Sequence, residues 1–154
     1  MTEARVEALD PKNVIGDLVV KEEFVRPNRR VFTIDKSGIR EAVSRLIKAY
    51  GETSVYVSTI AGVDRIEQGV MELNYFISIL PRKEIIVLRT QVPRTQPAVD
   101  TLIDIAPGTF ASESETFDLL GVQFNGNKLL KRGFFVPEDV TSKGVYPLRK
   151  DAKW

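Results

Sequence analysis

The sequence predicts a single α+β domain with a mixed or antiparallel sheet, helices on one face of that sheet, and a long irregular C-terminal tail. Three observations lead to this prediction. Segments with alternating polar and apolar residues follow one another in the middle of the chain, helical periodicity flanks them, and no clear periodicity remains after Phe124. We expect a flexible start over residues 1–12, a folded domain over 13–136 and an extended docking tail over 137–154.

The first helix has the clearest pattern. Apolar side chains recur every three or four residues from about Ser37 to Tyr50, which gives one apolar stripe. Asp35 or Ser37 can cap the start of this helix, and Gly51 stands where a helix commonly ends. The segment therefore predicts an amphipathic helix with one buried face.

Strand patterns lie on both sides of this helix. In the segment 70–80, every second residue is apolar, while Glu72, Asn74 and Ser78 fall on the opposite face. Only Pro81-Arg82-Lys83 separates this segment from the next strand, which predicts a hairpin. The expected strands are Val14–Val20, Glu23–Ile34 with an interruption at Arg26-Pro27-Asn28, Ser54–Ile60, Val70–Leu80 and Glu84–Val92.

Two shorter helices are expected after the hairpin. The segment Ala98–Ile105 is predicted as a short helix that Pro107-Gly108 stops. A second helix is expected from about Phe110 to Leu120, with Gly121 at its end. Prolines and glycines then interrupt the chain repeatedly, which favours an extended tail.

The composition excludes several kinds of chemistry. The chain has 154 residues, of which 43% are apolar and 28% charged, as is usual for one globular domain. It contains no cysteine, so disulfides, thiolate metal sites and cysteine-ligated iron–sulfur clusters are excluded. Histidine is also absent, which removes the usual general base near neutral pH. An enzyme that uses carboxylates, lysines, arginines, tyrosines or hydroxyls stays open on this inventory, but we expect no catalytic, cofactor-binding or metal-binding residues in this chain.

Charge and hydropathy indicate how the chain meets other molecules. The formal net charge is +1, but from Lys128 to Trp154 there are seven Lys or Arg against three Asp or Glu. This asymmetry suggests a docking tail, and a solvated surface loop is equally compatible with it. No stretch approaches the roughly 18 apolar residues needed to cross a bilayer. The first ten residues also lack the apolar core of a signal peptide, so any membrane association is expected through other proteins.

Three carboxylates crowd into a little over one turn of the last predicted helix. Glu113, Glu115 and Asp118 form this group, and two of them could act as acid and base or bind a hard cation. In the other interpretation, acidic residues near a helix start favour the dipole and pair with basic neighbours. The second interpretation is favoured, because no histidine or glycine-rich phosphate loop accompanies them.

The tail from Lys143 to Asp151 combines an aromatic residue, an aliphatic residue and several cations beside a proline. Arginine and tyrosine are the residue types that anchor protein interfaces. The same cations would suit a nucleic-acid backbone, but no aromatic residues are spaced along a basic strand. Since ordering such a tail costs conformational entropy, we expect a protein partner to order it.

Two segments carry a resemblance to a known family. Glu113 to Phe124 contains a glutamate pair, an aromatic–aspartate pair and a hydrophobic–Gly–hydrophobic–x–Phe pattern; Asn125-Gly126-Asn127-Lys128 and Lys131-Arg132 follow it. The second segment, Tyr146 to Asp151, has the sequence Tyr-Pro-Leu-Arg-Lys-Asp. Over roughly residues 35–151 the chain resembles the thirty-kilodalton subunit of respiratory complex I and its hydrogenase relatives.

The chain also departs from the family pattern. Ser114 replaces the arginine between the two glutamates, Ala111 replaces a tryptophan, and Asn127-Lys128 replaces a His–Pro pair. Weaker similarities lie at Ile60–Asp64 and Glu72–Tyr75. The departures make the chain most similar to the versions in energy-converting membrane-bound hydrogenases and related ferredoxin-linked complexes.

The resemblance implies a cofactor-free subunit of a hydrophilic arm on the cytoplasmic side of the membrane, in a complex coupled to ion translocation. Its implied partners are a large hydrogenase-like catalytic subunit and a small iron–sulfur subunit. Iron–sulfur clusters are expected in those partners, with nickel–iron where the large subunit keeps its metal site. The residues expected to contact a partner are Glu113, Glu115, Asp118, Lys131, Arg132, Tyr146, Pro147, Leu148, Arg149, Lys150 and Asp151.

Three alternatives remain open from the sequence. The first is a subunit of an NADH/quinone oxidoreductase, that is, complex I proper. The second is a stand-alone hydrolase that uses Glu113, Glu115 and Asp118, for which Glu115→Gln would abolish turnover without affecting assembly. The third is a nucleic-acid-binding module that uses the tail, whose affinity would fall steeply with salt.

Overall fold

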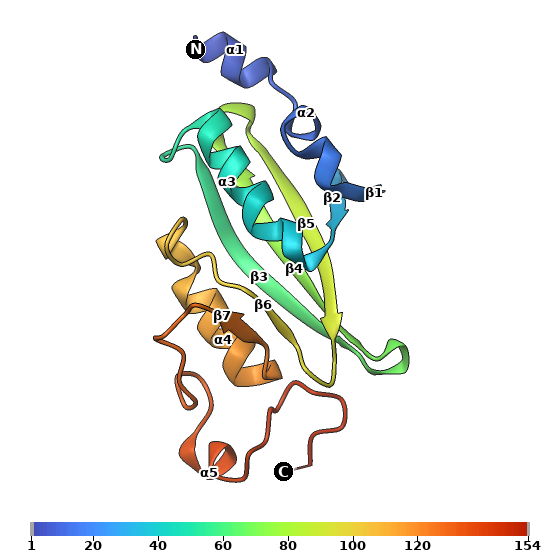
Figure 1. Ribbon diagram of the computed structural model, residues 1–154, viewed down its shortest axis with the longest axis vertical. Helices are drawn as coiled ribbons and strands as arrows, with labels where there is room; N and C mark the ends of the chain where they lie inside the picture. The colour runs from blue at the N-terminus through green and yellow to red at the C-terminus, as the bar shows by residue number, and fades with distance from the viewer. Residues whose placement is uncertain (1, 154) are drawn as a thin grey trace.

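A mixed five-stranded sheet forms the centre of the computed structural model, which describes residues 2–153 (Figure 1). The strand order is β1-β2-β5-β4-β3, and only β2 and β5 are parallel neighbours in this sheet. A second sheet pairs β6 with β7 in parallel. The strands are β1 (Val19–Val25), β2 (Arg29–Ile34), β3 (Val55–Arg65), β4 (Val70–Ile79), β5 (Glu84–Pro93), β6 (Ala98–Asp100) and β7 (Gln123–Asn125).

Two longer helices accompany the sheet. Helix α3 (Ile39–Tyr50) lies across one face, and α4 (Phe110–Leu120) packs against β3 nearer the C-terminal end of the molecule (Figure 1). The shorter helices are α1 (Glu3–Ala8), α2 (Pro11–Ile15) and α5 (Glu138–Thr141). Single 3₁₀ turns are η1 (Gly16–Leu18), η2 (Lys36–Gly38), η3 (Ile66–Gln68), η4 (Leu80–Arg82) and η5 (Pro107–Thr109).

The core lies between the helices and the sheet. The alternating apolar residues of β4 are all fully buried there, as their spacing predicts. The apolar stripe of α3 covers them with Ala42, Val43 and Leu46, which are also fully buried. The predicted α+β architecture, a mixed sheet with helices on one face, is therefore confirmed. The buried β4 residues are Met71, Leu73, Tyr75, Ile77 and Ile79.

A glycine in β3 allows α4 to approach the sheet closely. Gly62 is opposite Leu73 and faces the same side of the sheet. A Cβ atom at Gly62 would collide with Cδ1 of Leu120 and would lie 3.4 Å from Cγ2 of Thr116. Close packing of α4 on β3 therefore depends on a residue without a side chain.

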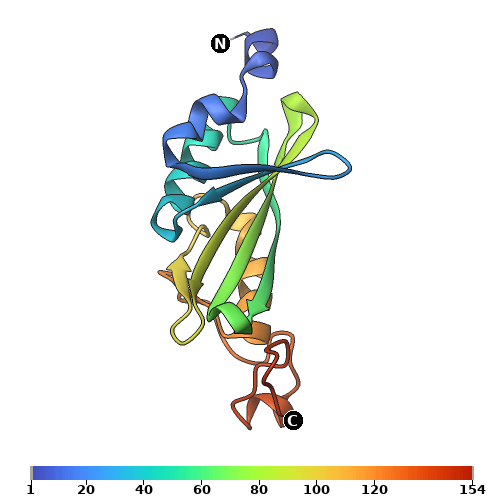
Figure 2. The same ribbon diagram turned by 90° about the vertical axis from the view of Figure 1, so that its right-hand side faces the viewer.

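The hairpin formed by β1 and β2 extends from the sheet on the side away from α3 (Figure 2). Its turn is at Arg26–Asn28, the point at which the sequence predicts an interruption.

Within residues 2–153, no helix is both long and apolar enough to cross a membrane. The start of the chain and its C-terminal segment lie at opposite ends of the long axis (Figure 1).

Two predicted secondary-structure elements, the strand Val14–Val20 and the helix Ala98–Ile105, are wrong. The expected strand Val14–Val20 begins as α2 and η1, and extended structure starts only at Val19. The structure also has α1 and α2 where the sequence predicts a flexible start. Proline at the first position of α2 and a hydrogen bond from the Lys12 N–H to Asp10 (2.8 Å) favour this helix.

The expected helix over residues 98–105 is replaced by β6 and a series of turns. Val99 is buried and pairs with Phe124, 25 positions away along the chain. The N–H of Leu102 donates to the Glu113 carboxylate (2.8 Å) rather than to a helical carbonyl. Tertiary pairing therefore overrides the local periodicity in this segment.

Candidate subunit interface

Helix α4 carries the family-like signature, and its first carboxylate connects the segments on either side of the helix. Glu113 is fully buried. It accepts hydrogen bonds from the Thr101 hydroxyl (2.7 Å), the Leu102 N–H (2.8 Å) and Asn127 Nδ2 (2.8 Å). Because buried carboxylates require such donors, Glu113 fixes the loop before α4 and the turn after β7 in one arrangement.

Asp118 has a similar role at the other end of α4. Its side chain is fully buried and accepts four hydrogen bonds. The donors are Nε of Arg132 (2.9 Å) and the N–H groups of Gly133 (3.0 Å), Phe135 (2.7 Å) and Val136 (2.9 Å). The irregular segment 132–136 is thus wrapped around one carboxylate.

The surroundings of Asp118 also determine its protonation. Burial alone would raise the pKa of the carboxyl group, but the N–H groups of Gly133 and Phe135, the Arg132 guanidinium and the Val136 N–H outweigh burial. They hold the pKa of Asp118 below its ordinary value. The group is therefore ionised at neutral pH, which does not suit a proton donor, and its oxygens are already occupied by four donors within the fold.

The aromatic residue of the tail packs against the end of α4. Gly121 ends the helix with φ +77°, and a Cβ atom there would lie 3.0 Å from Tyr146 ring atoms. The Arg132 guanidinium carbon is 4.1 Å from the centroid of this ring, and that of Arg149 is 5.4 Å away. The Tyr146 ring is therefore occupied by contacts with the end of α4 and with two arginines of its own chain, so it is not free to stack on a nucleic-acid base.

Tail residues also satisfy the last carbonyl groups of α4. The Leu148 N–H donates to the Leu119 carbonyl (3.0 Å), and Nε of Arg149 donates to the Leu120 carbonyl (2.8 Å). Helix ends leave such carbonyls without intrahelical partners, so these contacts cap α4 from a distant part of the chain.

The end of the tail is connected to the sheet through one arginine. Arg94 binds Asp64 through Nε (2.7 Å) and NH2 (2.9 Å), and it also binds Asp151 through NH2 (2.6 Å). The Lys150 N–H donates to Asp64 (2.8 Å). Hydrogen bonds from Arg94 are the main reason that the pKa values of Asp64 and Asp151 are lowered. The docking tail of the sequence prediction is therefore bound to its own domain.

These contacts correct part of the predicted partner-binding set. Direct contact with a partner is wrong for Glu113 and Asp118, because both are fully buried. Other predicted residues contact their own chain: Arg132, Tyr146, Arg149 and Asp151. Pro147 is half-buried. The exposed members of the set, which stay predicted partner contacts, are Glu115, Lys131, Leu148, Lys150 and Asp151.

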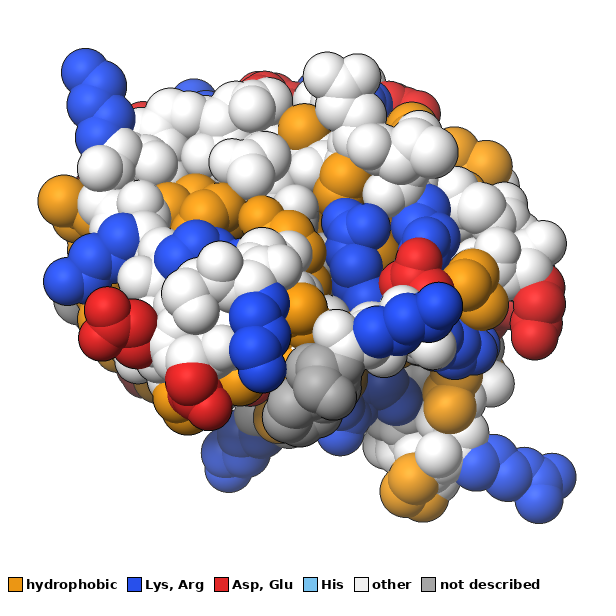
Figure 3. All heavy atoms as spheres, turned by 90° about the horizontal axis from the view of Figure 1, so that it is seen from below, with side chains coloured by type: hydrophobic (Ala, Val, Ile, Leu, Met, Phe, Trp, Pro, Cys, Tyr) orange, Lys and Arg blue, Asp and Glu red, His pale blue; other side chains and the backbone are white. Residues whose placement is uncertain are grey.

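The α4 end of the molecule exposes apolar side chains among cations. Phe134, Phe135 and Leu148 are 44%, 48% and 57% exposed, on segments that Asp118 and Leu119 hold. Lysine and arginine side chains outnumber carboxylates on this end of the molecule (Figure 3). We call segments 129–136 and 145–151, together with the exposed side of α4, the tail face. Exposed apolar groups within a charged rim are typical of protein interfaces.

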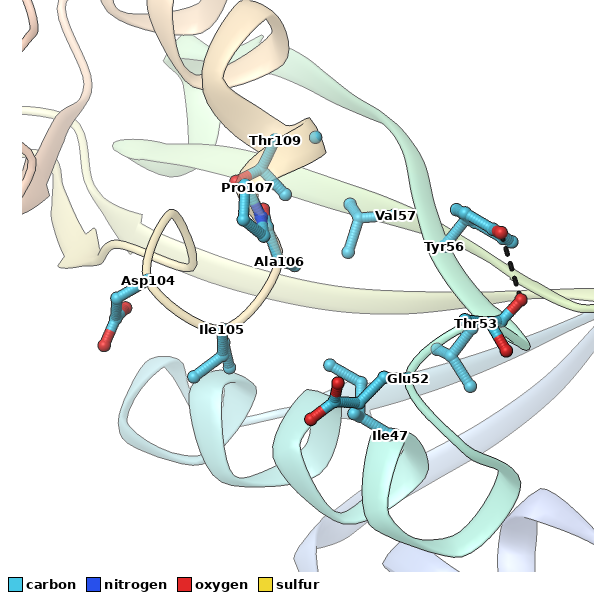
Figure 4. Close-up of a pocket in the computed structure, with 12 residues that line it drawn as sticks. Ile47, Glu52, Thr53, Tyr56, Val57, Asp104, Ile105, Ala106, Pro107 and Thr109 are labelled. Atoms are coloured by element: carbon cyan, nitrogen blue, oxygen red, sulfur yellow. Dashed lines mark hydrogen bonds between the residues drawn. The ribbon is translucent and has the colours of Figure 1, made fainter.

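A hollow of about 540 Å³ lies between the start of β3 and the loop before α4 (Figure 4). Its carboxylates are Glu52 and Asp104, and Asp104 is already paired with Arg40. The Tyr56 hydroxyl in its wall donates to the Thr53 carbonyl (3.0 Å). None of the three clustered carboxylates of α4 lines this hollow, so the hydrolase hypothesis has no pocket here.

Sequence reasoning missed several residues that build this region. Thr101 and Asn127 fix Glu113, while Arg94 connects the tail to β3. No local pattern could reveal these partners, because each lies 12 to 57 positions from the group it binds. Phe134 and Phe135 carried a usable signal, since two adjacent aromatic residues in an aperiodic segment indicate a contact surface.

The fold is that of known subunits of respiratory membrane complexes. A chain of the membrane-bound sulfane sulfur reductase, an archaeal respiratory membrane complex, superposes with a TM-score of 0.77. The superposition covers 92% of this chain and 82% of that chain, at 22% identity. At this identity the likeness establishes the fold.

The sequence establishes the family. A family model described as "Respiratory-chain NADH dehydrogenase, 30 Kd subunit" matches residues 32–154, and the chain belongs to this family. The C subunit of the NADH-quinone oxidoreductase of Roseiflexus castenholzii is 29% identical over 96% of this chain and 80% of that protein. The C subunit of the F(420)H(2) dehydrogenase of Methanosarcina mazei is 27% identical over 62% of this chain and 59% of that protein.

Proposed function

We propose that this chain is a non-catalytic subunit in the peripheral arm of a complex I-related, membrane-bound oxidoreductase. In this proposal the tail face docks on the large, hydrogenase-like catalytic subunit, and the same module includes a small iron–sulfur subunit. The complex as a whole carries the redox centres, and this chain orients and supports them. Membership of the thirty-kilodalton subunit family is the general basis of the proposal.

The exposed apolar groups of the tail face are the observation that carries the docking step. Asp118 and the last turn of α4 hold the backbone beneath Phe135 and Leu148, so little conformational entropy remains to be lost on binding. Pre-ordered apolar side chains surrounded by cations are well suited to anchor a subunit. In this proposal the two buried carboxylates, Glu113 and Asp118, shape the docking surface from within, while the exposed Glu115 remains a predicted partner contact.

We further propose that the complex is of the hydrogenase type and is linked to ferredoxin. Asn127-Lys128, in place of the His–Pro pair of the respiratory family pattern, supports this assignment. The fold likeness to the sulfane sulfur reductase chain is consistent with it. The second candidate is an NADH- or F420H2-dependent dehydrogenase, which the names of the Roseiflexus and Methanosarcina relatives favour.

Purification of the native complex through a tag on this chain tests the proposal. We expect a large hydrogenase-like subunit and an iron–sulfur subunit to co-purify in fixed ratio. The presence or absence of nickel in the large subunit, measured by metal analysis, separates the hydrogenase type from the dehydrogenase types. A stable, active monomer without such partners would contradict the proposal.

Two aspartate substitutions test the docking surface itself. Leu148→Asp and Phe135→Asp should each reduce co-purification of the large subunit at least about tenfold, because a buried charge disfavours an apolar interface. Leu80→Asp is the matched control, since Leu80 is 53% exposed and lies in η4, away from the tail face. Equal loss with all three variants would show that the tail face is not the docking surface.

A further inference from the structure

A groove opens on the face of the sheet that carries no helix. The β1–β2 hairpin extends on this side (Figure 2), and Val25, Arg26, Pro27 and Arg29 near its tip form one wall. Strands β3, β4 and β5 supply the floor and the opposite wall. The groove has a volume of about 430 Å³, and the β3 residues that line it, Ala61 and Val63, alternate with Gly62, which faces α4 on the other side.

The floor of the groove is apolar. Phe76 of β4 is paired with Val87 of β5, and Val87 in turn is paired with Val31 of β2. Val31 and Val87 are only 2% and 3% exposed, although no helix covers this face. The Arg29 side chain lies over Phe76, with its guanidinium carbon 5.4 Å from the ring centroid. Because Val31 and Val87 are already covered, the apolar surface that stays accessible in the groove comes from the half-buried side chains of Ala61, Val63 and Phe76, and an apolar group entering it would pack against these.

The cations around this floor differ in their partners. Arg89 is neutralised within the fold, because it donates to Asn74 Oδ1 (2.7 Å) and pairs with Glu23 (3.3 Å) and Glu72 (3.6 Å). Arg26 and Arg29 also line the groove. Among residues 2–153, neither of these two arginines has a carboxylate within 4.0 Å or donates a side-chain hydrogen bond. The groove thus combines an apolar floor with two guanidinium groups that lack an anionic partner.

We propose that this groove binds an extended acidic segment of a neighbouring subunit. A carboxylate of that segment pairs with the Arg26 and Arg29 guanidinium groups, and an adjacent apolar side chain packs against Ala61, Val63 and Phe76. Guanidinium groups bind carboxylates in a planar, two-bond geometry, which makes an acidic residue the best complement. This inference rests on the proposed function, because it requires that the chain works within a complex.

Other occupants fit less well. A second copy of this chain that met the groove symmetrically, hairpin against hairpin, would need free carboxylates on the hairpin, but Glu22 is paired with Lys12 and Glu23 with Lys21. The C-terminal segment is already bound within the fold, since Asp151 pairs with Arg94 and the Lys150 N–H donates to Asp64, and α1 lies at the other end of the long axis (Figure 1). Together with the tail face, the groove would allow this small chain to hold two other subunits at once.

Photo-crosslinking in the native complex tests the proposal. Val25 lines the groove and is 46% exposed, so p-benzoylphenylalanine replaces it in the tagged, full-length chain. Irradiation of the purified complex should give one main adduct, mapped by mass spectrometry to a segment of another subunit with Asp or Glu close to the attachment point. The same replacement at Phe24, which is 69% exposed but does not line the groove, is the control and should not label that segment.

Charge reversal then tests the role of the two arginines. Arg26→Glu combined with Arg29→Glu should lower the adduct yield at least about tenfold, whereas Lys at both positions should retain most of it. Thermal melting of the purified chain checks that the reversed variant is folded. An unchanged yield after charge reversal, an adduct to a second copy of this chain, or attachment to a segment without carboxylates would overturn the proposal. Co-purification of the complex without any groove adduct would overturn it while leaving the proposed function intact.

Discussion

Asp118 and Glu113 belong to an acidic sequence signature of the kind usually found on a protein surface, but both residues are buried inside the fold. Each carboxylate binds at least one main-chain N–H from a segment that has no regular structure of its own. Such charge-assisted hydrogen bonds are stronger than neutral ones, and unpaired buried donors are costly. The two residues therefore determine the shape of the tail face without belonging to its exposed surface.

Replacement of Asp118 by Asn should destabilise the chain by roughly 2 to 4 kcal/mol, because an amide cannot satisfy the four donors that the carboxylate binds. Folding lowers the pKa of Asp118. The ionised carboxylate therefore stabilises the fold fully at pH values above the pKa of the unfolded state, and this stabilisation is lost as the pH falls through the pKa of the folded state. Urea titrations between about pH 6 and 2 should show a shallower acid dependence for D118N than for the wild type.

Gly121→Ala should destabilise the chain by about 1 to 2 kcal/mol, because φ is +77° and the new methyl group would meet the Tyr146 ring. Gly69→Ala is a matched control: φ is +69°, but no atom lies within 4 Å of the added carbon. Hydrogen exchange of residues 145–151 should accelerate in G121A and stay unchanged in G69A. Equal exchange in both variants would mean that Tyr146 does not anchor the tail.

Ionisation of Tyr50 should lower the stability of the fold at alkaline pH. Its hydroxyl donates to the Leu9 carbonyl, and burial raises the pKa of Tyr50 to about 12. A raised folded pKa stabilises the chain below the unfolded pKa of about 10, and this contribution is lost as pH rises through the folded value. The free energy of unfolding should fall by roughly 2 kcal/mol more in the wild type than in Tyr50→Phe between about pH 10 and 12. Parallel pH profiles would contradict this prediction.

At the scale of elements, the contact between α4 and β3 depends on one pair of residues. Gly62→Ala should push Leu120 from its position and destabilise the chain by about 1 to 2 kcal/mol. Leu120→Ala alone should cost roughly 2 to 4 kcal/mol through a cavity. In the double variant the two effects should fall short of additive by about 1 kcal/mol, because the shorter side chain leaves room for the methyl group. Strict additivity in denaturant titrations would show that the two residues are not in contact.

The elements that sequence predicts well are those with a strong local period. The helix ending at Tyr50 and the hairpin of β4 and β5 are confirmed, because burial of one face imposes spacings of 3.6 and 2. Strand β6 could not be foreseen, since only its pairing with β7 selects extended structure at Ala98–Asp100. The same reason applies to the site. The mix of aromatic, aliphatic and basic residues around Leu148 predicts a contact surface from the sequence alone, whereas the burial of Glu113 depends on loops distant in sequence.

At the scale of the whole molecule, we expect the tail to contribute more to assembly with a partner than to folding of the domain. A chain that ends after Pro137 lacks α5 and the contacts of Tyr146, Arg149 and Asp151, but it retains the sheet, α3 and α4. We expect its far-UV circular dichroism to keep the sheet signal and its melting temperature to fall by several degrees, roughly the effect of 1 to 3 kcal/mol. Co-purification of the large subunit should be lost.

The full-length Arg149→Ala variant is the control for this truncation. It removes the contact with the Leu120 carbonyl and one of the two arginines beside Tyr146 while keeping the backbone of the tail. It should show a smaller loss of stability and only partial loss of the partner. If the truncated chain fails to fold, the tail belongs to the core of the domain rather than to its docking surface.

The opposite positions of the two ends of the chain have a practical consequence (Figure 1). A purification tag or a fluorescent protein attached before α1 would stand at the pole farthest from the tail face. The same fusion placed after Lys153 would sit beside Arg94 and Asp151, where the tail is connected to the sheet. Distance measurements between labels at the two ends would therefore report the direction in which this subunit points within its assembly.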